Sequence, residues 1–480
     1  MRKGRLARRF FFSFNEVVWM IKVIADTKEM LRDRIFLKKA VMIALPVALQ
    51  GMLNTIVNLV DTMMIGQLGE TTIAAVGLAN KVFFVFSLLV FGVASGSGVL
   101  AAQYWGNQDE KNIRKVTGLA LLIALAGSLF FVIPSVLCPW AVMRIFTNSE
   151  GAIQAGAVYL AVAALSYPFT ALTNIYVAML RAVGRVKAPV MISCMTILIN
   201  ISLNYTLIFG HFGAPRLGAQ GAAIATLAAR VVESGAILGV VYLTHSPIAG
   251  KFKELFGYSR AFVRQFAGTA SPVIANEFIW GLGTTMYSLA YGRMGDNAVA
   301  SITIATTIQD IVVVLFQGLS AATAVILGNE MGAGKLRQAE KYAKNFFILQ
   351  FLVTLGAMGF CYGIREGIIG MYSISPEVAE DVNRCLIVFI LYMPFKMFNF
   401  VNIVGVLRSG GDTKMCLILD TSGVWLIGVP MAFLGGLYLR QTIAVVYGMV
   451  MSEEIYKAVA GYLRYRQKKW LRNLAVELEG

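Results

Sequence analysis

Apolar residues dominate this chain of 480 residues, and they are gathered into stretches of similar length. Each stretch is close to the roughly 20 residues that an α-helix needs to cross the hydrocarbon core of a bilayer. The period-2 alternation of a membrane β-barrel is absent, which favours helices. The pattern predicts about twelve membrane-spanning helices, near residues 41–65, 73–101, 117–142, 153–180, 188–210, 219–244, 265–292, 298–328, 344–363, 378–407, 415–438 and 441–462.

The sequence also contains an internal repeat. At a shift of 226 residues the shared positions are Pro46/Pro272, Gly66/Gly292, Gly69/Gly295, Ala74/Ala300, Ala79/Ala305, Gly92/Gly318, Gly106/Gly332 and Pro168/Pro394. At a shift of 227 they are Leu180-Arg181/Leu407-Arg408, Gly184/Gly411 and Lys187/Lys414. Two apolar repeats of this kind predict an all-α integral membrane protein with twelve transmembrane helices in two homologous six-helix lobes around a central cleft.

The repeat sets the expected domain boundaries. Because six spans are an even number, both copies enter the membrane from the same side, and the axis that relates them runs along the membrane normal. The expected segments are a basic cytoplasmic N-terminal extension (1–38), an N-lobe (39–246), a cytoplasmic linker (247–261), a C-lobe (262–464) and a cytoplasmic C-terminal tail (465–480).

Composition agrees with a membrane protein, since 58% of residues are hydrophobic and 14% are charged, too apolar for a soluble domain. The net charge of +16 would fit a nucleic-acid partner, but its placement argues against one. One alternating set of short connections holds Lys111, Arg114, Lys115, Arg181, Arg185, Lys187, Lys251, Lys253, Arg260, Arg264, Lys335, Arg337, Lys341, Lys344, Arg408 and Lys414, and the other set holds Arg144, Arg216, Arg293, Arg365 and Arg440. The positive-inside rule places the first set and both termini in the cytoplasm, so we expect a multi-pass protein of the plasma (inner) membrane with lipid, not nucleic acid, as its partner.

Polar residues inside the apolar spans are the candidates for chemistry, because polar groups are costly in hydrocarbon. In the first span Gln50, Asn54, Asn58 and Asp61 fall within an arc of roughly 80° at 100° per residue. One face with a single carboxylate indicates a cation or proton site. A buried hydrogen-bonded network that holds helices together is the alternative.

The fifth span also has one polar face, formed by Ser193, Thr196, Asn200 and Asn204 within an arc of roughly 80°. Amide and hydroxyl oxygens are hard ligands that suit a small cation such as Na⁺, and with Asp61 they would make a mixed oxygen site. A proton relay and plain packing remain alternatives.

The seventh span carries Glu277, Trp280, Thr284, Tyr287, Ser288 and Tyr291 on one face. A carboxylate beside aromatic rings suits an organic cation through Coulomb attraction and cation–π contact, although aromatic residues at helical spacing also fit a core. The eighth span has Asp310 and the tenth has Lys396 and Asn399. Lys396 is a possible partner of Glu277 or Asp310, since a buried cation seldom stands alone. Glu233 and Asp420 lie nearer span ends, where pairing with Arg230 or Lys414 is an alternative to a functional role.

Other chemistries lack support in the sequence. The five cysteines are scattered with no C-x-x-C, so they fit packing better than a metal site or disulfides. The segment Gly328–Leu336 approaches a phosphate loop, but that motif needs Gly at Asn329 and Ser or Thr at Leu336. We therefore expect no enzyme activity and no cofactor beyond a coupling ion, Na⁺ or H⁺, whose gradient supplies the energy.

Six short motifs resemble the multidrug and toxic compound extrusion (MATE) family over roughly residues 38–470. They are Val60-Asp61-Thr62-Met63-Met64-Ile65-Gly66, Ala102-Gln103-Tyr104-Trp105-Gly106, Leu180-Arg181-Ala182-Val183-Gly184, Asn200-x-x-x-Asn204-Tyr205, Gly221-Ala222-Ala223-Ile224-Ala225-Thr226 and Pro272-x-x-x-Asn276-Glu277. The resemblance implies a twelve-helix antiporter that expels organic, often cationic, compounds in exchange for Na⁺ or H⁺. It places the ion site at Asp61 with Asn200, Asn204 and Thr226. Some members have Asp where this chain has Asn204, and others have a carboxylate in the tenth span, where this chain has Lys396 and Asn399.

These observations lead to one main hypothesis and one alternative. The main hypothesis is an antiporter, expected to act as a monomer, with ion-binding residues Asp61, Asn58, Asn200, Asn204 and Thr226 and substrate-binding residues Gln50, Asn54, Glu277, Trp280, Tyr287, Asp310, Lys396 and Asn399. The alternative is a flippase for a lipid-linked precursor, which would need a strongly basic cavity. The mainly acidic intramembrane charges disfavour it.

Overall fold

The computed structural model describes residues 25–372 and 374–476, and the regular structure within them is helical. Residues 1–24 of the expected N-terminal extension and 477–480 of the expected tail lie outside the described residues. The first lobe contains α2 (Arg34–Gly66), α3 (Glu70–Gly106), α4 (Glu110–Leu137), the short α5 (Pro139–Arg144), α6 (Glu150–Ala163) running through a 3₁₀ turn (Ala164–Ser166) into α7 (Tyr167–Ala182), α8 (Lys187–Phe209) and α9 (Ala219–Leu243). The short α10 (Phe252–Phe256) follows in the linker.

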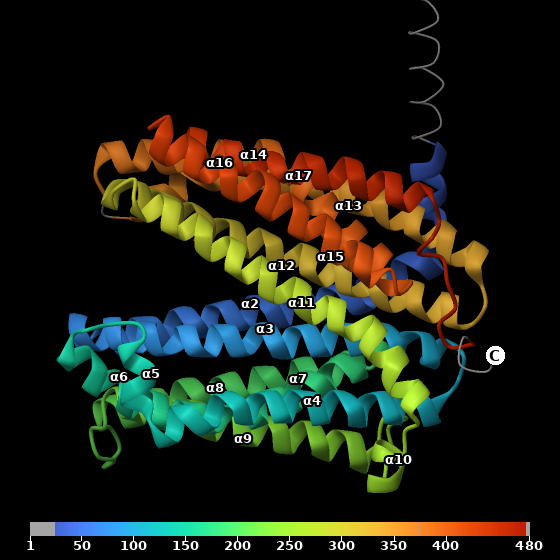
Figure 1. Cartoon of the computed structure of the whole chain (residues 1–480), viewed down its shortest axis with the longest axis horizontal. Coiled ribbons are helices and arrows are strands. Elements are labelled where there is room, and N and C mark those ends of the chain that lie inside the picture. Colours follow the sequence, from blue (N-terminus) through green and yellow to red (C-terminus); the bar gives the residue numbers. More distant parts are fainter. Residues whose placement is uncertain (1–24, 373, 477–480) are drawn as a thin grey trace, which may run out of the picture.

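The second lobe repeats this order. It contains α11 (Arg260–Gly292), α12 (Asp296–Gly332), α13 (Leu336–Ile369), α14 (Pro376–Asn399) continuing as the π-helical η2 (Phe400–Leu407), then α15 (Thr413–Ser422), η3 (Gly423–Gly428), α16 (Val429–Phe433) and η4 (Leu434–Tyr438) in one run, and α17 (Ile443–Arg466). Figure 1 shows the lobes as two stacked groups of helices, one blue to green and the other yellow to red. The expectation of an all-α protein with two six-helix lobes is confirmed.

Ten helical segments among the described residues are long and apolar enough to cross a membrane. The two remaining long helices, α11 and α17, lie where the sequence predicts the spans 265–292 and 441–462. They are less apolar because their interiors carry polar groups: Glu277 in α11, and Glu453, Glu454 and Lys457 in α17. Charged residues within the membrane are costly and mark functional sites, so these two helices are candidates for a functional role.

The two ends of the bundle differ in charge. We call the end at which α2 begins and α3 ends the basic end, because most lysines and arginines near the connections lie there, either within the connections 183–186, 244–259, 333–335 and 408–412 or, after the connection 107–109, in the first turns of α4. The other end is called the opposite end. In Figure 1 the ribbons of the two lobes converge where the C-terminus lies and diverge toward the opposite end.

Each lobe receives part of the other's first helix. Phe36 of α2 packs in the hydrophobic core of the C-lobe, where its ring meets Phe346 edge-on at 4.9 Å between centroids. Phe262 and Phe266 of α11 pack in the core of the N-lobe. The deep-blue start of α2 against the orange helices is visible in Figure 1. The lobes therefore exchange the halves of their first helices that lie nearer the basic end.

Small residues bring the two backbones together at the basic end. A Cβ added at Gly106 would lie 2.0 Å from the carbonyl oxygen of Asn329, and one at Gly332 would lie 1.9 Å from that of Gln103. Only glycine permits such an approach between membrane helices. At the opposite end of α11, by contrast, no heavy atom lies within 4 Å of the Cβ position of Gly292. The described structure is therefore closed at the basic end.

Polar contacts reinforce the closed end. The side chain of Gln103 donates to the carbonyl of Ser409 at 2.8 Å and accepts from the backbone N–H of Leu474 at 2.6 Å. Lys39 of α2 pairs with Glu330 of α12 at 2.9 Å. Within residues 25–372 and 374–476, the hydrogen bonds and ion pairs that join the lobes lie in the half nearer the basic end.

Candidate functional site

The carboxylate of Asp61 lies on α2, about one turn before the helix ends, and its side chain is half-buried. The Nδ2 of Asn204 donates a hydrogen bond to Asp61 Oδ1 at 2.6 Å and lies 3.2 Å from Asn200 Oδ1. Both asparagines are buried on α8, one turn apart on the same face. Three of the five predicted ion ligands are thus brought together, and a bond to a charged acceptor is among the stronger kinds of hydrogen bond.

The other two predicted ion ligands lie outside this hydrogen-bonded group in the described structure. Asn58 lies one turn before Asp61 but is exposed, and Thr226 is half-buried on α9. Asn54, predicted for substrate, is also exposed on α2. Helical periodicity shows which residues share one face of a helix. It does not show which of those residues contact a neighbouring helix.

A second polar network joins α2 to other helices of the N-lobe. Gln50 of α2 is buried, donates to Ser193 Oγ on α8 at 2.8 Å, and accepts from Arg181 at 2.5 Å. Ser193 in turn donates to Glu233 of α9 at 3.3 Å, and Glu233 pairs with Arg230 at 2.6 Å. The amide of Gln50, predicted to bind substrate, is therefore engaged by its own lobe, and the pairing of Glu233 with Arg230 is observed.

Of the two acids considered as partners of Lys396, Glu277 is paired with a different residue. Its carboxylate lies 3.2 Å from Arg408, not beside Lys396. The side chain of Arg408 is 2% exposed and also donates to Ser95 of α3 at 3.0 Å. Arg408 therefore joins α11 to the N-lobe. The sequence signal was available, because Arg408 is the repeat counterpart of Arg181, but the repeat alone does not say which acid it meets.

Three residues of α17 form a charged cluster that the sequence analysis did not single out. Lys457 lies 3.2 Å from Glu453 and 3.8 Å from Glu454, and all three side chains are more than nine-tenths buried. Tyr287 donates to Glu453 at 2.6 Å, and Asn399 donates to Glu454 at 2.8 Å. The signal for this cluster was two acids and a lysine inside a predicted span.

The remaining predicted residues lie around this cluster. Lys396 approaches Glu454 at 4.0 Å, which is the limit of an ion pair. Asp310 of α12 is exposed and interacts electrostatically with Lys396. Trp280 of α11 is 40% exposed. The residues predicted to share one face of α11 thus have different surroundings. Glu277 and Tyr287 contact buried charges, whereas Trp280 is open to the surroundings.

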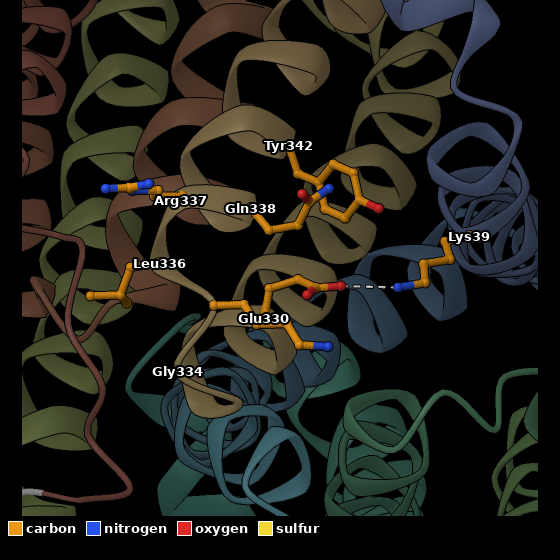
Figure 2. Close-up of a pocket in the computed structure, with 8 residues that line it drawn as sticks. Lys39, Glu330, Gly334, Leu336, Arg337, Gln338 and Tyr342 are labelled. Atoms are coloured by element: carbon orange, nitrogen blue, oxygen red, sulfur yellow. Dashed lines mark hydrogen bonds and ion pairs between the residues drawn. The ribbon is translucent and has the colours of Figure 1, made fainter.

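A pocket of about 710 Å³ opens at the basic end, where α2 meets the turn from α12 to α13. It is lined by Lys39, Glu330, Gly334, Lys335, Leu336, Arg337, Gln338 and Tyr342. Figure 2 shows the ion pair between Lys39 and Glu330 at this pocket. The segment that resembles a phosphate loop in sequence therefore forms part of the contact between the lobes.

Comparison with known proteins agrees with this geometry. The MatE family model matches residues 46–206 and 272–434, so its two matches begin at the repeat pair Pro46 and Pro272. The probable multidrug resistance protein NorM of Thermotoga maritima is 24% identical over 454 residues, which cover 92% of this chain and 95% of that protein. The multidrug resistance protein PmpM of Pseudomonas aeruginosa is 27% identical over 416 residues, which cover 85% of each chain.

A solved structure shares the fold. It is described as the outward-facing conformation of a multidrug resistance MATE family transporter of the MOP superfamily, and it matches with a TM-score of 0.81 at 20% identity, over 90% of this chain and 95% of that one. The family model covers both lobes and more than half of the chain. The resemblance seen in the sequence motifs is confirmed, and this chain belongs to the MatE family of multi-pass membrane proteins.

Proposed function

We propose that this chain is a secondary active antiporter that exports organic, often cationic, compounds in exchange for Na⁺ or H⁺. The observation that carries the proposal is the half-buried carboxylate of Asp61, which is hydrogen-bonded by Asn204 at 2.6 Å within a membrane helix. A half-buried carboxylate among membrane helices is costly unless it binds a proton or a cation. The names of NorM and PmpM, which describe multidrug resistance, support the substrate class.

The mechanism follows from a fold with two lobes. The lobes meet at the basic end and diverge at the other, and alternating access requires a second state in which this relationship is reversed. An ion can shift the balance between these states only through a difference in its affinity for them. Asp61 and Asn204 belong to different helices, α2 and α8, so a relative movement of these helices changes the ion's ligands.

The basic end is assigned to the cytoplasm of the plasma membrane on the distribution of lysine and arginine. A native cysteine permits a test, because Cys138 is exposed at the opposite end. In intact cells, an impermeant maleimide should label Cys138, and in a Cys138→Ser background it should not label a cysteine introduced for Lys111 at the basic end. The reverse pattern would overturn the orientation.

The experiment that tests the function uses purified protein in proteoliposomes with a fluorescent organic cation inside. A Na⁺ gradient and a pH gradient are imposed separately, with a choline gradient at equal osmolarity as the control. Efflux that is stimulated by one of the two gradients supports antiport and identifies the ion. Equal efflux under all three conditions would contradict it.

The flippase alternative has less support from the charges. A pyrophosphate headgroup requires basic side chains that are free to bind it. The buried Arg408 is paired with Glu277, and the buried Lys457 is paired with Glu453 and Glu454. These positive charges are neutralised within the chain, which favours export of an organic cation.

A further inference from the structure

The polar networks of the two lobes are built on equivalent positions. Gln50 donates to Ser193 at 2.8 Å in the N-lobe, and Asn276 donates to Asp420 at 3.0 Å in the C-lobe. Residue 276 follows residue 50 by 226 positions and residue 420 follows residue 193 by 227, which are the shifts of the repeat. The contact between the first and fifth helices of each lobe has therefore been kept, with a carboxylate in place of a hydroxyl.

The sixth helices of the two lobes, α9 and α17, also carry charged residues at equivalent positions, but the signs of the charges are reversed. Helix α9 begins at residue 219 and α17 at residue 443, a shift of 224. That shift places Glu454 opposite Arg230 and Lys457 opposite Glu233. Each pair is spaced i, i+3, with 2.6 Å between the charged atoms in α9 and 3.8 Å in α17. The N-lobe thus directs a carboxylate toward its fifth helix, and the C-lobe directs an ammonium group toward the equivalent place.

The ammonium group of Lys457 is surrounded by acids. It lies 3.2 Å from Glu453 and 3.8 Å from Glu454, and it interacts electrostatically with Asp420. Its side chain is 5% exposed. A buried charge is stable only when it is paired and hydrogen-bonded, so Lys457 and these carboxylates depend on one another.

The backbone of η3 leaves room for this arrangement. A Cβ at Gly423 would lie 2.9 Å from Cε of Lys457, and one at Gly428 would lie 2.0 Å from the hydroxyl of Tyr287 and 2.4 Å from Oε2 of Glu453. Any other residue at these two positions would displace the lysine stem or the tyrosine–glutamate hydrogen bond. π-Helical segments such as η3 occur frequently at functional sites.

The remaining groups around the cluster complete its hydrogen bonding. Tyr287 of α11 donates to Glu453, and Asn399 of α14 donates to Glu454. Lys396 of α14 lies 4.0 Å from Glu454. Donors from the chain itself therefore occupy the directions in which these two carboxylates would otherwise bind a cation.

We propose that Lys457 is a tethered counter-cation that occupies, in the C-lobe, the place of a bound metal ion. The C-lobe then keeps a neutralised polar centre throughout transport, and Asp61 of the N-lobe carries the ion coupling alone. This inference rests on the antiport proposed above for the meaning of coupling, but the arrangement around Lys457 is tested separately. Lys457 acts through Glu453 and Glu454 and is a positioning residue.

The test measures thermal unfolding of purified protein in detergent at one fixed pH, with NaCl or choline chloride at equal ionic strength. Asp61→Asn is the background, so that a Na⁺ response from the N-lobe does not interfere. Adding Lys457→Met removes the ammonium group and leaves the carboxylates. We expect this variant to unfold at lower temperature in choline chloride and to recover by roughly 2 °C or more in NaCl, because a bound ion stabilises the folded state.

Two further variants act as controls in the same background. Lys457→Arg keeps the charge and should show no selective response to Na⁺. Glu453→Gln combined with Lys457→Met removes one acid together with the base, and should unfold at higher temperature than Lys457→Met in choline chloride. If Lys457→Met shows the same difference between NaCl and choline chloride as its background, or if the added Glu453→Gln gives no recovery, the tethered-cation proposal is wrong.

The outcome is independent of transport. A Na⁺-dependent rise in the unfolding temperature of Lys457→Met supports the tethered cation whatever the transport result. If Asp61→Asn nevertheless exports substrate normally, only the coupling role proposed for Asp61 is wrong. Conversely, if Asp61→Asn loses export and Lys457→Met shows no Na⁺ response, the antiporter proposal is supported and the tethered-cation proposal is wrong.

Discussion

The side-chain amide of Asn204 donates a hydrogen bond of 2.6 Å to the carboxylate of Asp61. The carbonyl oxygen of the same amide is buried and has no hydrogen-bond partner within the described residues. Asparagine carries both a donor and an acceptor, so a rotation of the amide would offer Oδ1 to a cation at Asp61, next to Oδ1 of Asn200. One residue can thus satisfy the carboxylate with and without a bound ion.

Replacing Asn204 by alanine should therefore weaken ion binding. The variant loses the amide oxygen that would ligate the ion, an interaction with a charged group worth about 1.5–3 kcal/mol. The ion concentration that gives half-maximal efflux should rise roughly tenfold to a hundredfold, since 1.4 kcal/mol corresponds to a factor of ten. Asn58→Ala, at an exposed position on α2, should change this concentration less than about twofold. Equal effects of the two variants would contradict the assignment of Asn204.

Removing the partner of a buried acid should destabilise the molecule strongly. Arg408→Met leaves Glu277 unpaired, which costs about 3–5 kcal/mol for a buried ion pair. Arg408→Met combined with Glu277→Gln should regain most of that loss, because no unpaired charge remains. Unfolding of the four proteins of this double-mutant cycle in detergent provides the measurement. Additive losses would show that the two side chains do not interact.

Closure at the basic end should be sensitive to a single methyl group. A Cβ at Gly106 would lie 2.0 Å from the backbone oxygen of Asn329, so Gly106→Ala should separate the lobes there. In a background without native cysteines, a cysteine at the buried Ser409 should react with a maleimide about fivefold to a hundredfold faster, because overpacking costs about 1–3 kcal/mol. Gly98→Ala, on the same helix with no atom within 4 Å of its Cβ position, should leave the rate unchanged. A faster rate in the Gly98 variant, or none in the Gly106 variant, would contradict this view of the closed state.

The ion pair between Lys39 and Glu330 should contribute much less to closure. The Lys39 side chain is 47% exposed, so solvent screens the pair even though Glu330 is 11% exposed, and solvent-screened ion pairs are worth about 0–1 kcal/mol. Glu330→Gln should therefore increase the labelling of the cysteine at Ser409 by no more than about fivefold, and high salt should produce a similar change in the parent protein. An increase as large as that of Gly106→Ala would mean that charge, not backbone packing, holds this end closed.

The fold could be predicted from the sequence because it depends on patterns along the chain. The length of the apolar stretches and the recurrence of Pro46 and Gly106 as Pro272 and Gly332 predict twelve helices in two lobes. The exchange of the first helices could not be predicted in this way. Phe36 and Phe262 are ordinary apolar residues in the sequence, and only packing decides which core receives them.

The candidate site was predictable only in part, for a related reason. Helical periodicity places Asp61, Asn200 and Asn204 on polar faces, and the structure brings those faces together. Periodicity does not give the depth or the neighbour of a side chain, so it leaves Glu277 and Asp310 as alternative partners of Lys396, whereas the structure pairs Glu277 with Arg408 and places Lys396 near Asp310. The charges of the cluster on α17 are spaced three or four residues apart, a spacing that also fits ordinary ion pairs within a helix, so the sequence does not show that they are buried together.

The account depends most on Asp61, and efflux from proteoliposomes under the coupling-ion gradient tests it most directly. Asp61→Asn keeps the size of the side chain and an acceptor for Asn204, so the protein should remain folded, as judged by its elution and its unfolding temperature. Gradient-driven efflux should fall to the level seen without a gradient. Efflux at the parent rate from this variant would contradict the account.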